Sequence, residues 1–138
     1  MTGTFKRRDN QGGKIKPPPQ GSGSILQEKP VFSLIHLQSN YDLDKCTQAE
    51  KASFADKLYR LSRMTWGEIR VAHRHGLGFE TIARTSIKAG IPDVITPDVR
   101  IIAFRFHEKA PMVGFHQGGT VVFHVVWLDR GFTLYEHG

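Results

Sequence analysis

The sequence predicts a single α+β domain with an N-terminal strand, two or three helices, and a C-terminal antiparallel meander of three to four strands. Three observations support this fold class. A short apolar run comes first, two helix start signals follow it, and the last forty residues alternate β-rich runs with turn residues. We expect the domain to span residues 30–138, behind a tail at residues 1–29.

The tail is poor in the residues that build a core. Gly, Pro and Ser dominate residues 12–13, 17–19 and 21–24. Such a composition cannot bury enough apolar surface to offset the chain entropy lost on ordering. The tail also carries six Lys or Arg against two acidic residues. We expect a disordered basic arm that serves either as a linker or as a nucleic-acid-binding tail.

The domain is predicted to open with a strand and a helix. Residues 31–37 are short, apolar and β-rich, which is typical of a strand. Thr47 and Glu50 then have the spacing of a capping box, in which each side chain accepts a hydrogen bond from the backbone N–H of the other residue. Apolar residues follow at helical spacing, so we expect an amphipathic helix that ends near Ser62.

A second capping box indicates another helix directly after the first. Thr65 and Glu68 form this signal, and the glycines from Gly76 onward are expected to end the helix. Residues 79–90 fit either a third short helix or irregular structure. Residues 91–98 contain two prolines and are predicted to form a loop.

Four further runs predict the C-terminal sheet. Residues 99–107, 112–117 and 120–129 read as successive strands, and the last of them is apolar on both faces. Gly118-Gly119 is a hairpin signal, because both central positions of a type I′ turn need positive φ. Residues 132–136 are expected to close the sheet as a final strand.

The net charge of +6 is unevenly distributed. Residues 31–138 hold 13 Lys or Arg against 11 acidic residues, whereas residues 45–90 alone hold nine against four. A basic helical region attracts polyanions, although a solvated helix face has the same composition. Cations at a helix C-terminus also complement its dipole. The candidate nucleic-acid-binding residues are Arg60, Arg63, Arg70, His73, Arg74 and His75.

The composition argues against a membrane or secreted protein. The longest apolar run, at residues 121–128, is far shorter than the roughly 20 residues that cross a bilayer. The N-terminus lacks the apolar stretch of a signal peptide, so we expect a cytoplasmic protein. Cys46 has no second cysteine to pair with, and the sequence holds no metal-binding, phosphate-loop or dinucleotide motif. We therefore expect no metal and no cofactor.

Arg105 and His107 are the leading candidates for chemistry. Strand alternation places both on one face, opposite the phenylalanines beside them. With a two-residue loop at the hairpin, His116 and His124 fall on opposite faces of the sheet. His124 lies between valines, where a hydrogen-bonded core histidine is the more common case.

The layout and the C-terminal Tyr135-Glu136-His137 resemble the RelE/HigB/YoeB-like toxin superfamily. Members of that superfamily are small messenger-RNA endonucleases that act on the ribosome and are neutralised by an antitoxin protein. The resemblance implies that Arg105 steadies a phosphate, that His107 or His137 moves protons, and that Tyr135 stacks on or orients a base. It also implies RNA, the ribosome and an antitoxin as partners.

The first hypothesis is therefore a metal-independent endoribonuclease. RNA cleavage needs a base, an acid and a cation that stabilises the phosphorane charge. Histidine exchanges protons near neutral pH, and arginine binds phosphate through two parallel hydrogen bonds. The hypothesis requires Arg105 and His137 to be neighbours on one open side of the sheet. The candidate catalytic residues are Arg105, His107, His116, Tyr135 and His137.

The alternative is a non-enzymatic accessory module of the kind carried by phages or mobile elements. In that hypothesis the basic helical region binds nucleic acid or protein, and the histidines are structural. Convergence of the candidate residues in one exposed pocket favours the enzyme, whereas scattered or buried residues favour the module.

Overall fold

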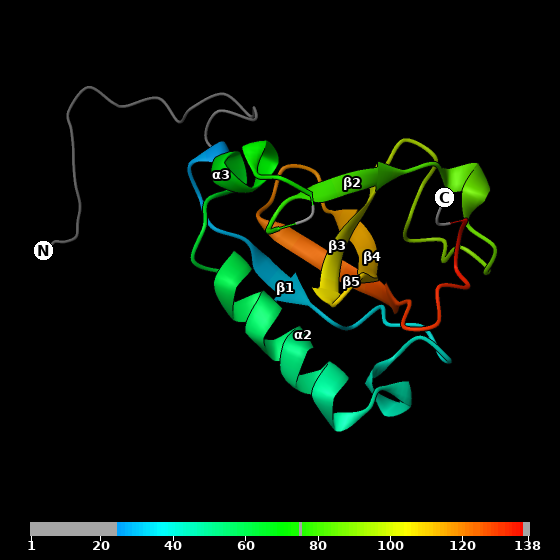
Figure 1. Ribbon diagram of the computed structural model, residues 1–138. Coiled ribbons are helices and arrows are strands. Elements are labelled where there is room, and N and C mark those ends of the chain that lie inside the picture. The colour runs from blue at the N-terminus through cyan, green and yellow to red at the C-terminus, as the bar shows by residue number, and fades with distance from the viewer. Residues whose placement is uncertain (1–24, 75, 137–138) are drawn as a thin grey trace, which may run out of the picture.

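The computed structural model describes residues 25–74 and 76–136, and within them the protein is an α+β fold (Figure 1). The helices are α2 (Gln48–Leu61) and α3 (Trp66–Val71), with 3-10 turns η1 (Leu43–Lys45) and η2 (Arg84–Ser86). The strands are β1 (Val31–Ser33), β2 (Phe79–Ile82), β3 (Ile101–His107), β4 (Ala110–His116) and β5 (Val122–Leu128).

The strands form one mixed five-stranded sheet in the order β1-β5-β4-β3-β2. β2, β3, β4 and β5 pair antiparallel, whereas β1 pairs parallel with β5, in register Val31 with Val122. The N-terminal strand therefore lies at one edge of the sheet beside the last strand. β2 forms the opposite edge.

Local side-chain capping explains where the two helices begin. Thr47 Oγ1 accepts from the Glu50 backbone N–H at 3.1 Å, and Glu50 Oε1 accepts from the Thr47 N–H at 2.7 Å. Thr65 and Glu68 repeat the arrangement at the start of α3. Both predicted capping boxes are confirmed. Each satisfies backbone donors that have no partner within the helix.

α3 is shorter than predicted. It ends at Val71, and Ala72 is already extended with ψ 155°. The chain then folds back so closely that a Cβ on Gly78 would overlap the carbonyl oxygen of Ala72. This close approach turns the chain into β2 instead of continuing the helix to Gly76.

Three further sequence predictions were wrong in detail. Residues 79–82 form β2 because they pair with β3, a partner distant in sequence. The first strand ends at Ser33 instead of residue 37, and a turn follows in which the Leu37 N–H donates to the Leu34 carbonyl oxygen at 3.2 Å. Residues 132–136 do not form a strand.

Asp129 explains the structure of that last segment. Its fully buried carboxylate accepts from the Thr133 N–H at 2.8 Å and from the Leu134 N–H at 3.1 Å. These bonds satisfy the backbone in a turn and direct Leu134 and Tyr135 into the core. Side-chain bonds thus replace the sheet pairing that the apolar pattern predicted.

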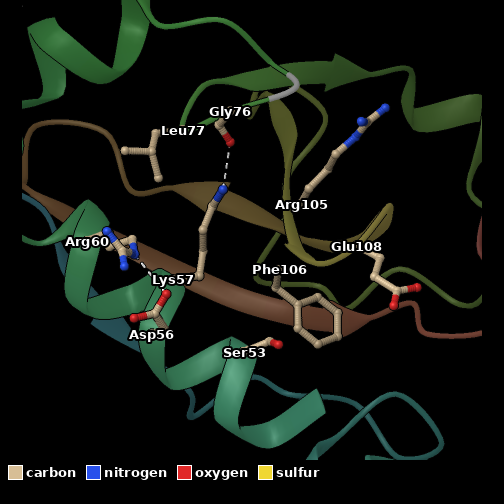
Figure 2. Close-up of a pocket in the computed structure, with 9 residues that line it drawn as sticks. All are labelled: Ser53, Asp56, Lys57, Arg60, Gly76, Leu77, Arg105, Phe106 and Glu108. Carbon is tan, nitrogen blue, oxygen red and sulfur yellow. Dashed lines mark hydrogen bonds and ion pairs between the residues drawn. The ribbon is translucent and has the colours of Figure 1, made fainter. Parts of the chain in front are cut away.

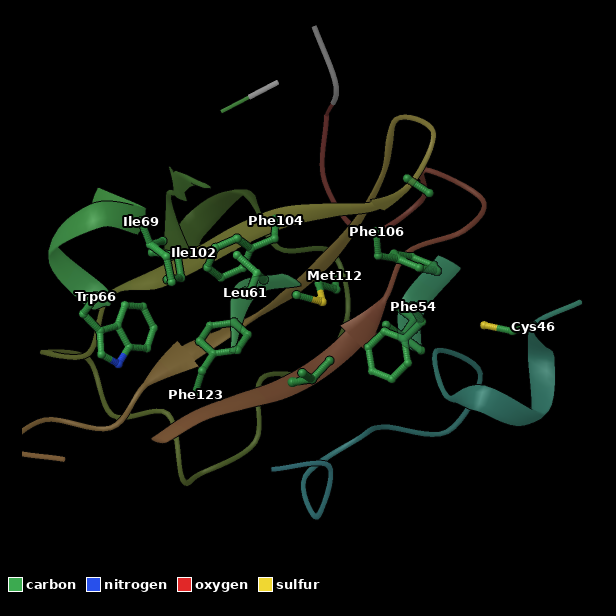
Figure 3. Packing of buried hydrophobic residues seen from close by; sticks show 13 residues of the cluster. Cys46, Phe54, Leu61, Trp66, Ile69, Ile102, Phe104, Phe106, Met112 and Phe123 are labelled. Carbon is green, nitrogen blue, oxygen red and sulfur yellow. The ribbon is translucent and has the colours of Figure 1, made fainter. Parts of the chain in front are cut away.

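Two apolar cores lie on the two faces of the sheet. The first packs α2 and α3 against the sheet through Phe54, Leu61, Phe104 and Phe123 (Figure 3). The second is covered by the loops that precede β3 and follow β5, with the fully buried Trp127 among its members. In β3 and β4 the even-numbered residues serve the first core and the odd-numbered residues serve the second. The alternation is interrupted in β5, where the adjacent Val126 and Trp127 both serve the second core, at the register shift against β4.

The packed part of the chain begins earlier than the sequence predicted. Ile25 and Leu26 pack against the first core, and the Trp66 N–H donates to the Glu28 carbonyl oxygen at 2.8 Å. The predicted tail boundary at Pro30 is therefore wrong for residues 25–29. The rest of the predicted tail, residues 1–24, lies outside the described residues. Among the helices of the described chain, none has the length and apolarity required to cross a membrane.

Candidate functional site

A register shift in β3 places Arg105 and His107 on different sides of the sheet. Arg105 pairs with Pro111 and His107 with Ala110, so the strand bulges between them. Ala110 belongs to the core under α2, and His107 accordingly turns toward α2. The expectation that simple alternation keeps both residues on one face was wrong because a bulge adds a residue and reverses the parity.

The same end of β3 has an open edge. Pairing with β2 begins only at Phe104 and Phe79, so Arg105 and the residues after it extend past the start of β2. Between this edge and α2 lies a groove of about 430 Å³ (Figure 2). The groove is lined by Ser53, Asp56, Lys57, Arg60, Gly76, Leu77, Arg105, Phe106 and Glu108.

Lys57 projects from α2 across this groove, as Figure 2 shows. Its Nζ donates to the Gly76 carbonyl oxygen at 2.7 Å. Burial lowers the pKa of Lys57, and the positive charge of Arg105 lowers it further. The protonated Lys57 is therefore a stronger acid than an ordinary surface lysine.

His107 is not itself a lining residue, but it lies in the chain between the lining residues Phe106 and Glu108. Its Nδ1 is 2.8 Å from Ser53 Oγ, one helical turn before Lys57 on α2. The side chain is 25% exposed, and Nε2 lies 3.9 Å from Glu108 Oε2. The hydrogen bond at Nδ1 fixes the ring, and Nε2, the other ring nitrogen, is the one that can exchange protons with a bound molecule.

The groove carries more positive than negative charge. Lys57, Arg60 and Arg105 supply three cations against the carboxylates of Asp56 and Glu108. Asp56 Oδ2 is 2.8 Å from Arg60 Nε, so one carboxylate is already paired. An anionic ligand such as a phosphate diester fits this balance.

Arg105 also borders a second, smaller hollow of about 50 Å³ on the other side of β3. Arg74, Glu80, Lys109 and Tyr135 are among the residues that line it. Arg74 Nη1 is 2.6 Å from Glu80 Oε1. Figure 2 shows the Arg105 side chain pointing away from α2, toward this side of the strand.

Tyr135 is buried, with 6% of its surface exposed. Burial, helped by the charges of Glu80 and Asp129, raises its pKa to about 12, so the phenol stays protonated at neutral pH. Its ring packs in the core behind the second hollow. The stacking of Tyr135 on a base stays a prediction, and a ring this buried has little exposed surface for it.

No family model, curated protein or solved structure matches this chain. The chemistry of the groove must be inferred from its own residues.

His116 lies away from the groove. His116 is the last residue of β4, and Ala110, which pairs with His107, is the first. The two histidines are therefore about 20 Å apart along the strand direction. The His116 ring stacks on Trp66 with centroids 4.2 Å apart, and its Nε2 contacts the Thr120 carbonyl oxygen. The structure therefore does not bring His116 together with Arg105 and His107, and its contacts are structural.

The predicted nucleic-acid-binding residues divide among several places. Arg60 lines the groove and Arg74 the second hollow, whereas Arg63, Arg70 and His73 are exposed on or after the helices. They do not form one continuous helix face.

Two predicted site residues, His75 and His137, lie outside the described residues, so the required proximity of Arg105 and His137 stays a prediction. Within residues 25–74 and 76–136, no group of three or more His, Cys, Asp or Glu side chains is arranged to hold a metal ion.

Sequence reasoning missed Ser53 and Lys57. Their spacing of four residues on the polar side of α2 was a signal that they share a helix face. Nothing local connects Ser53 to His107, which is 54 residues away in the chain. That contact depends on the bulge in β3 and on the packing of α2 against the sheet.

The register of the last hairpin differs from the prediction, but its consequence for the histidines holds. His116 pairs with Phe123 and Phe115 with His124, a shift of two positions that preserves the faces. His116 and His124 therefore lie on opposite faces, as predicted.

His124 is a buried core histidine, which confirms the structural interpretation. Its Nε2 donates to Gln117 Oε1 at 2.8 Å, and its ring stacks on Phe115. His36 lies with its ring centroid 4.9 Å from that of His124. The His124 Nδ1 is buried and has no hydrogen-bond partner within the described chain.

This environment predicts a loss of stability in acid. Burial and the neighbouring His36 lower the pKa of His124 from its ordinary 6.5. Because the folded protein binds this proton less readily than the unfolded chain, protonation favours unfolding. The contribution of His124 to the free energy of unfolding is therefore complete above about pH 6.5. It decreases as the pH falls toward the lowered pKa of the folded state. We expect the urea midpoint of unfolding to decrease between about pH 7.5 and about pH 5.5.

A pair of variants assigns this effect to His124. His124→Phe keeps a ring on Phe115 but cannot be protonated, and we expect a smaller decrease of the midpoint. His73→Gln removes an exposed histidine and should retain the decrease of the unmodified protein. An unchanged decrease in His124→Phe would contradict the assignment.

Proposed function

We propose that the groove between α2 and β3 binds the phosphate backbone of RNA and cleaves it by acid–base chemistry of its own side chains. The observation that supports this most directly is that Lys57, Arg60 and Arg105 line one open groove. His107 is held next to that groove by its contact with the lining residue Ser53. A base, an acid and a phosphate-binding cation are the groups that cleavage requires.

In the proposed reaction, His107 acts as the base. With its Nδ1–H donated to Ser53 Oγ, the Nε2 lone pair accepts the proton of the ribose 2′-hydroxyl. The 2′-oxygen forms a bond to the adjacent phosphorus, and the bond from phosphorus to the 5′-oxygen of the next nucleotide breaks. The products are a cyclic phosphate and a free 5′-hydroxyl.

Lys57 and Arg105 stabilise the negative charge that develops on the departing 5′-oxygen and on the phosphorane, respectively. Lys57 has a lowered pKa and donates a proton to the departing 5′-oxygen. In this proposal the Arg105 side chain turns from the second hollow into the groove, where it holds the non-bridging phosphate oxygens and stabilises the extra charge of the phosphorane. Ser53 is a positioning residue, since it acts only through His107.

The resemblance to RelE-like toxins belongs to this proposal. It adds messenger RNA on the ribosome as the substrate, an antitoxin as the protein that covers the groove, and the cytoplasm as the location. Of the catalytic residues that the resemblance implied, Arg105 and His107 border the groove region, and His137 is a further candidate for the acid.

Binding to RNA tests the phosphate-binding part. We expect the logarithm of the affinity for RNA to decrease linearly with the logarithm of the salt concentration. Lys57→Ala with Arg105→Ala should flatten this slope by roughly 0.7 for each phosphate that the variant no longer neutralises. Fluorescence anisotropy of a labelled RNA at several salt concentrations measures both quantities.

The matched control removes the same two residue types elsewhere. Lys51 is exposed on α2, and Arg100 is exposed just before β3. Lys51→Ala with Arg100→Ala should leave the slope within error of the unmodified protein. If the groove variant and the control behave alike, or if RNA does not bind, the proposal is wrong. Cleavage should also persist in the presence of a chelator.

A further inference from the structure

Tyr59 is an exposed aromatic side chain on α2, the helix that contributes four of the residues lining the groove. It lies on the outer face of α2, and 59% of it is exposed. The guanidinium carbon of Arg63 sits 5.4 Å from the centroid of its ring, and Arg63 Nη1 donates to the Tyr59 hydroxyl at 3.2 Å. The ring is thus oriented by a cation although it is not buried.

Its place on the helix connects it to the groove. Tyr59 directly precedes Arg60 and is three residues after Asp56, and both of these residues line the groove. On the helix surface, the ion-paired Asp56 and Arg60 therefore lie between Tyr59 and the lining residue Lys57. A chain bound along the groove has the ring of Tyr59 at its flank.

A single exposed aromatic residue is ordinary on a protein surface. Tyr59 differs because Arg63 contacts both its ring and its hydroxyl, and because Arg60 follows it directly on α2. An aromatic ring next to basic side chains is the arrangement that binds single-stranded nucleic acid, in which bases stack on rings and cations contact the backbone. A duplex does not offer this contact, because its bases are already stacked and paired.

We propose that Tyr59 stacks on an unpaired base of the RNA whose backbone lies in the groove, so that the protein selects single-stranded RNA. This inference rests on the proposed function of the groove and adds the strand state of the substrate. The ring supplies the selectivity, and the groove supplies the attraction to phosphate.

The test compares one RNA sequence in two forms. A 2′-O-methyl RNA of about twelve nucleotides without self-complementarity cannot be cleaved by 2′-hydroxyl attack and covers a typical single-strand site. It is measured alone and annealed to its complement, by fluorescence anisotropy at fixed salt. We expect the single strand to bind more tightly than the duplex.

Three variants locate the selectivity. Tyr59→Ala should weaken single-strand binding by about tenfold, which is within the range for removal of one stacked base. It should leave duplex binding and the salt slope unchanged, since the ring carries no charge. Tyr59→Phe keeps the ring and should bind within about twofold of the unmodified protein. Phe132→Ala removes another exposed aromatic ring and should have no effect.

The outcomes separate this inference from the proposed function. One outcome is a flatter salt slope in the variant that lacks Lys57 and Arg105, together with unchanged single-strand affinity in Tyr59→Ala. This outcome would overturn the role of Tyr59 and would still support phosphate binding by the groove. Equal affinity for single strand and duplex would overturn the selectivity. Failure of both RNA forms to bind would overturn both proposals.

Discussion

Replacing His107 by alanine is expected to lower the rate of RNA cleavage by about two to four orders of magnitude, the usual contribution of a general base. The physical reason is that His107 is the histidine proposed to take the 2′-hydroxyl proton, since its side chain contacts the lining residue Ser53 and no described histidine is itself a lining residue. RNA affinity should change little, because the phosphate-binding cations remain. Gel analysis of a labelled RNA under single-turnover conditions measures the rate.

Controls distinguish the loss of a base from a loss of structure. The exposed His73 serves as the matched histidine, and His73→Ala should cleave at the normal rate. Ser53→Ala should reduce the rate less than His107→Ala does and should shift its pH profile, because it alters the hydrogen bond at the His107 Nδ1. Normal cleavage by a folded His107→Ala protein would exclude His107 as the base.

The substitution Gly114→Ala is expected to destabilise the fold by about 3 kcal/mol or more. Gly114 lies in β4 at a register shift against β5, where the strands approach closely. An added Cβ would overlap the carbonyl oxygen of His124 and lie 2.9 Å from its carbonyl carbon. Two central strands would have to separate, since a backbone group cannot move aside as a flexible side chain can.

Gly118→Ala is the matched control. Gly118 lies in the loop between β4 and β5, and an added Cβ there meets nothing within 4 Å. Urea unfolding followed by circular dichroism should give a large decrease in unfolding free energy for Gly114→Ala and little change for Gly118→Ala. Similar stability of the two variants would contradict the close approach of the strands at Gly114.

The helix starts could be predicted because their causes are local. Thr47 with Glu50, and Thr65 with Glu68, satisfy backbone donors within four residues, so the pattern alone determines the position. Where α3 ends is different, because the close approach of Gly78 to Ala72 is a tertiary contact. The α+β class followed from these local signals and from the β-rich runs.

The edges of the sheet could not be predicted, because pairing partners decide them. β2 has no strong alternation of its own and becomes a strand by pairing with β3. Residues 132–136 have a strand-like pattern, yet the buried Asp129 takes their backbone hydrogen bonds. Local propensity is overridden in both cases by a partner outside the segment.

The site was predicted only in part for the same reason. Arg105 and His107 were chosen from strand alternation, but the bulge between them gives each a different set of neighbours. Ser53 and Lys57 were missed because their importance depends on α2 packing beside that bulge. The residue types indicated acid–base and phosphate-binding chemistry, but the bulge in β3 decides which of these residues lie near the groove.

The parallel pairing of β1 with β5 has a consequence for how the protein is made. β1 is synthesised before α2, α3 and the other strands, and β5 is synthesised after all of them. Contacts between such distant segments close late and slowly. A growing chain must therefore keep its first strand unpaired until β5 has been synthesised, and a protein truncated before Val122 would leave that strand without its pairing partner.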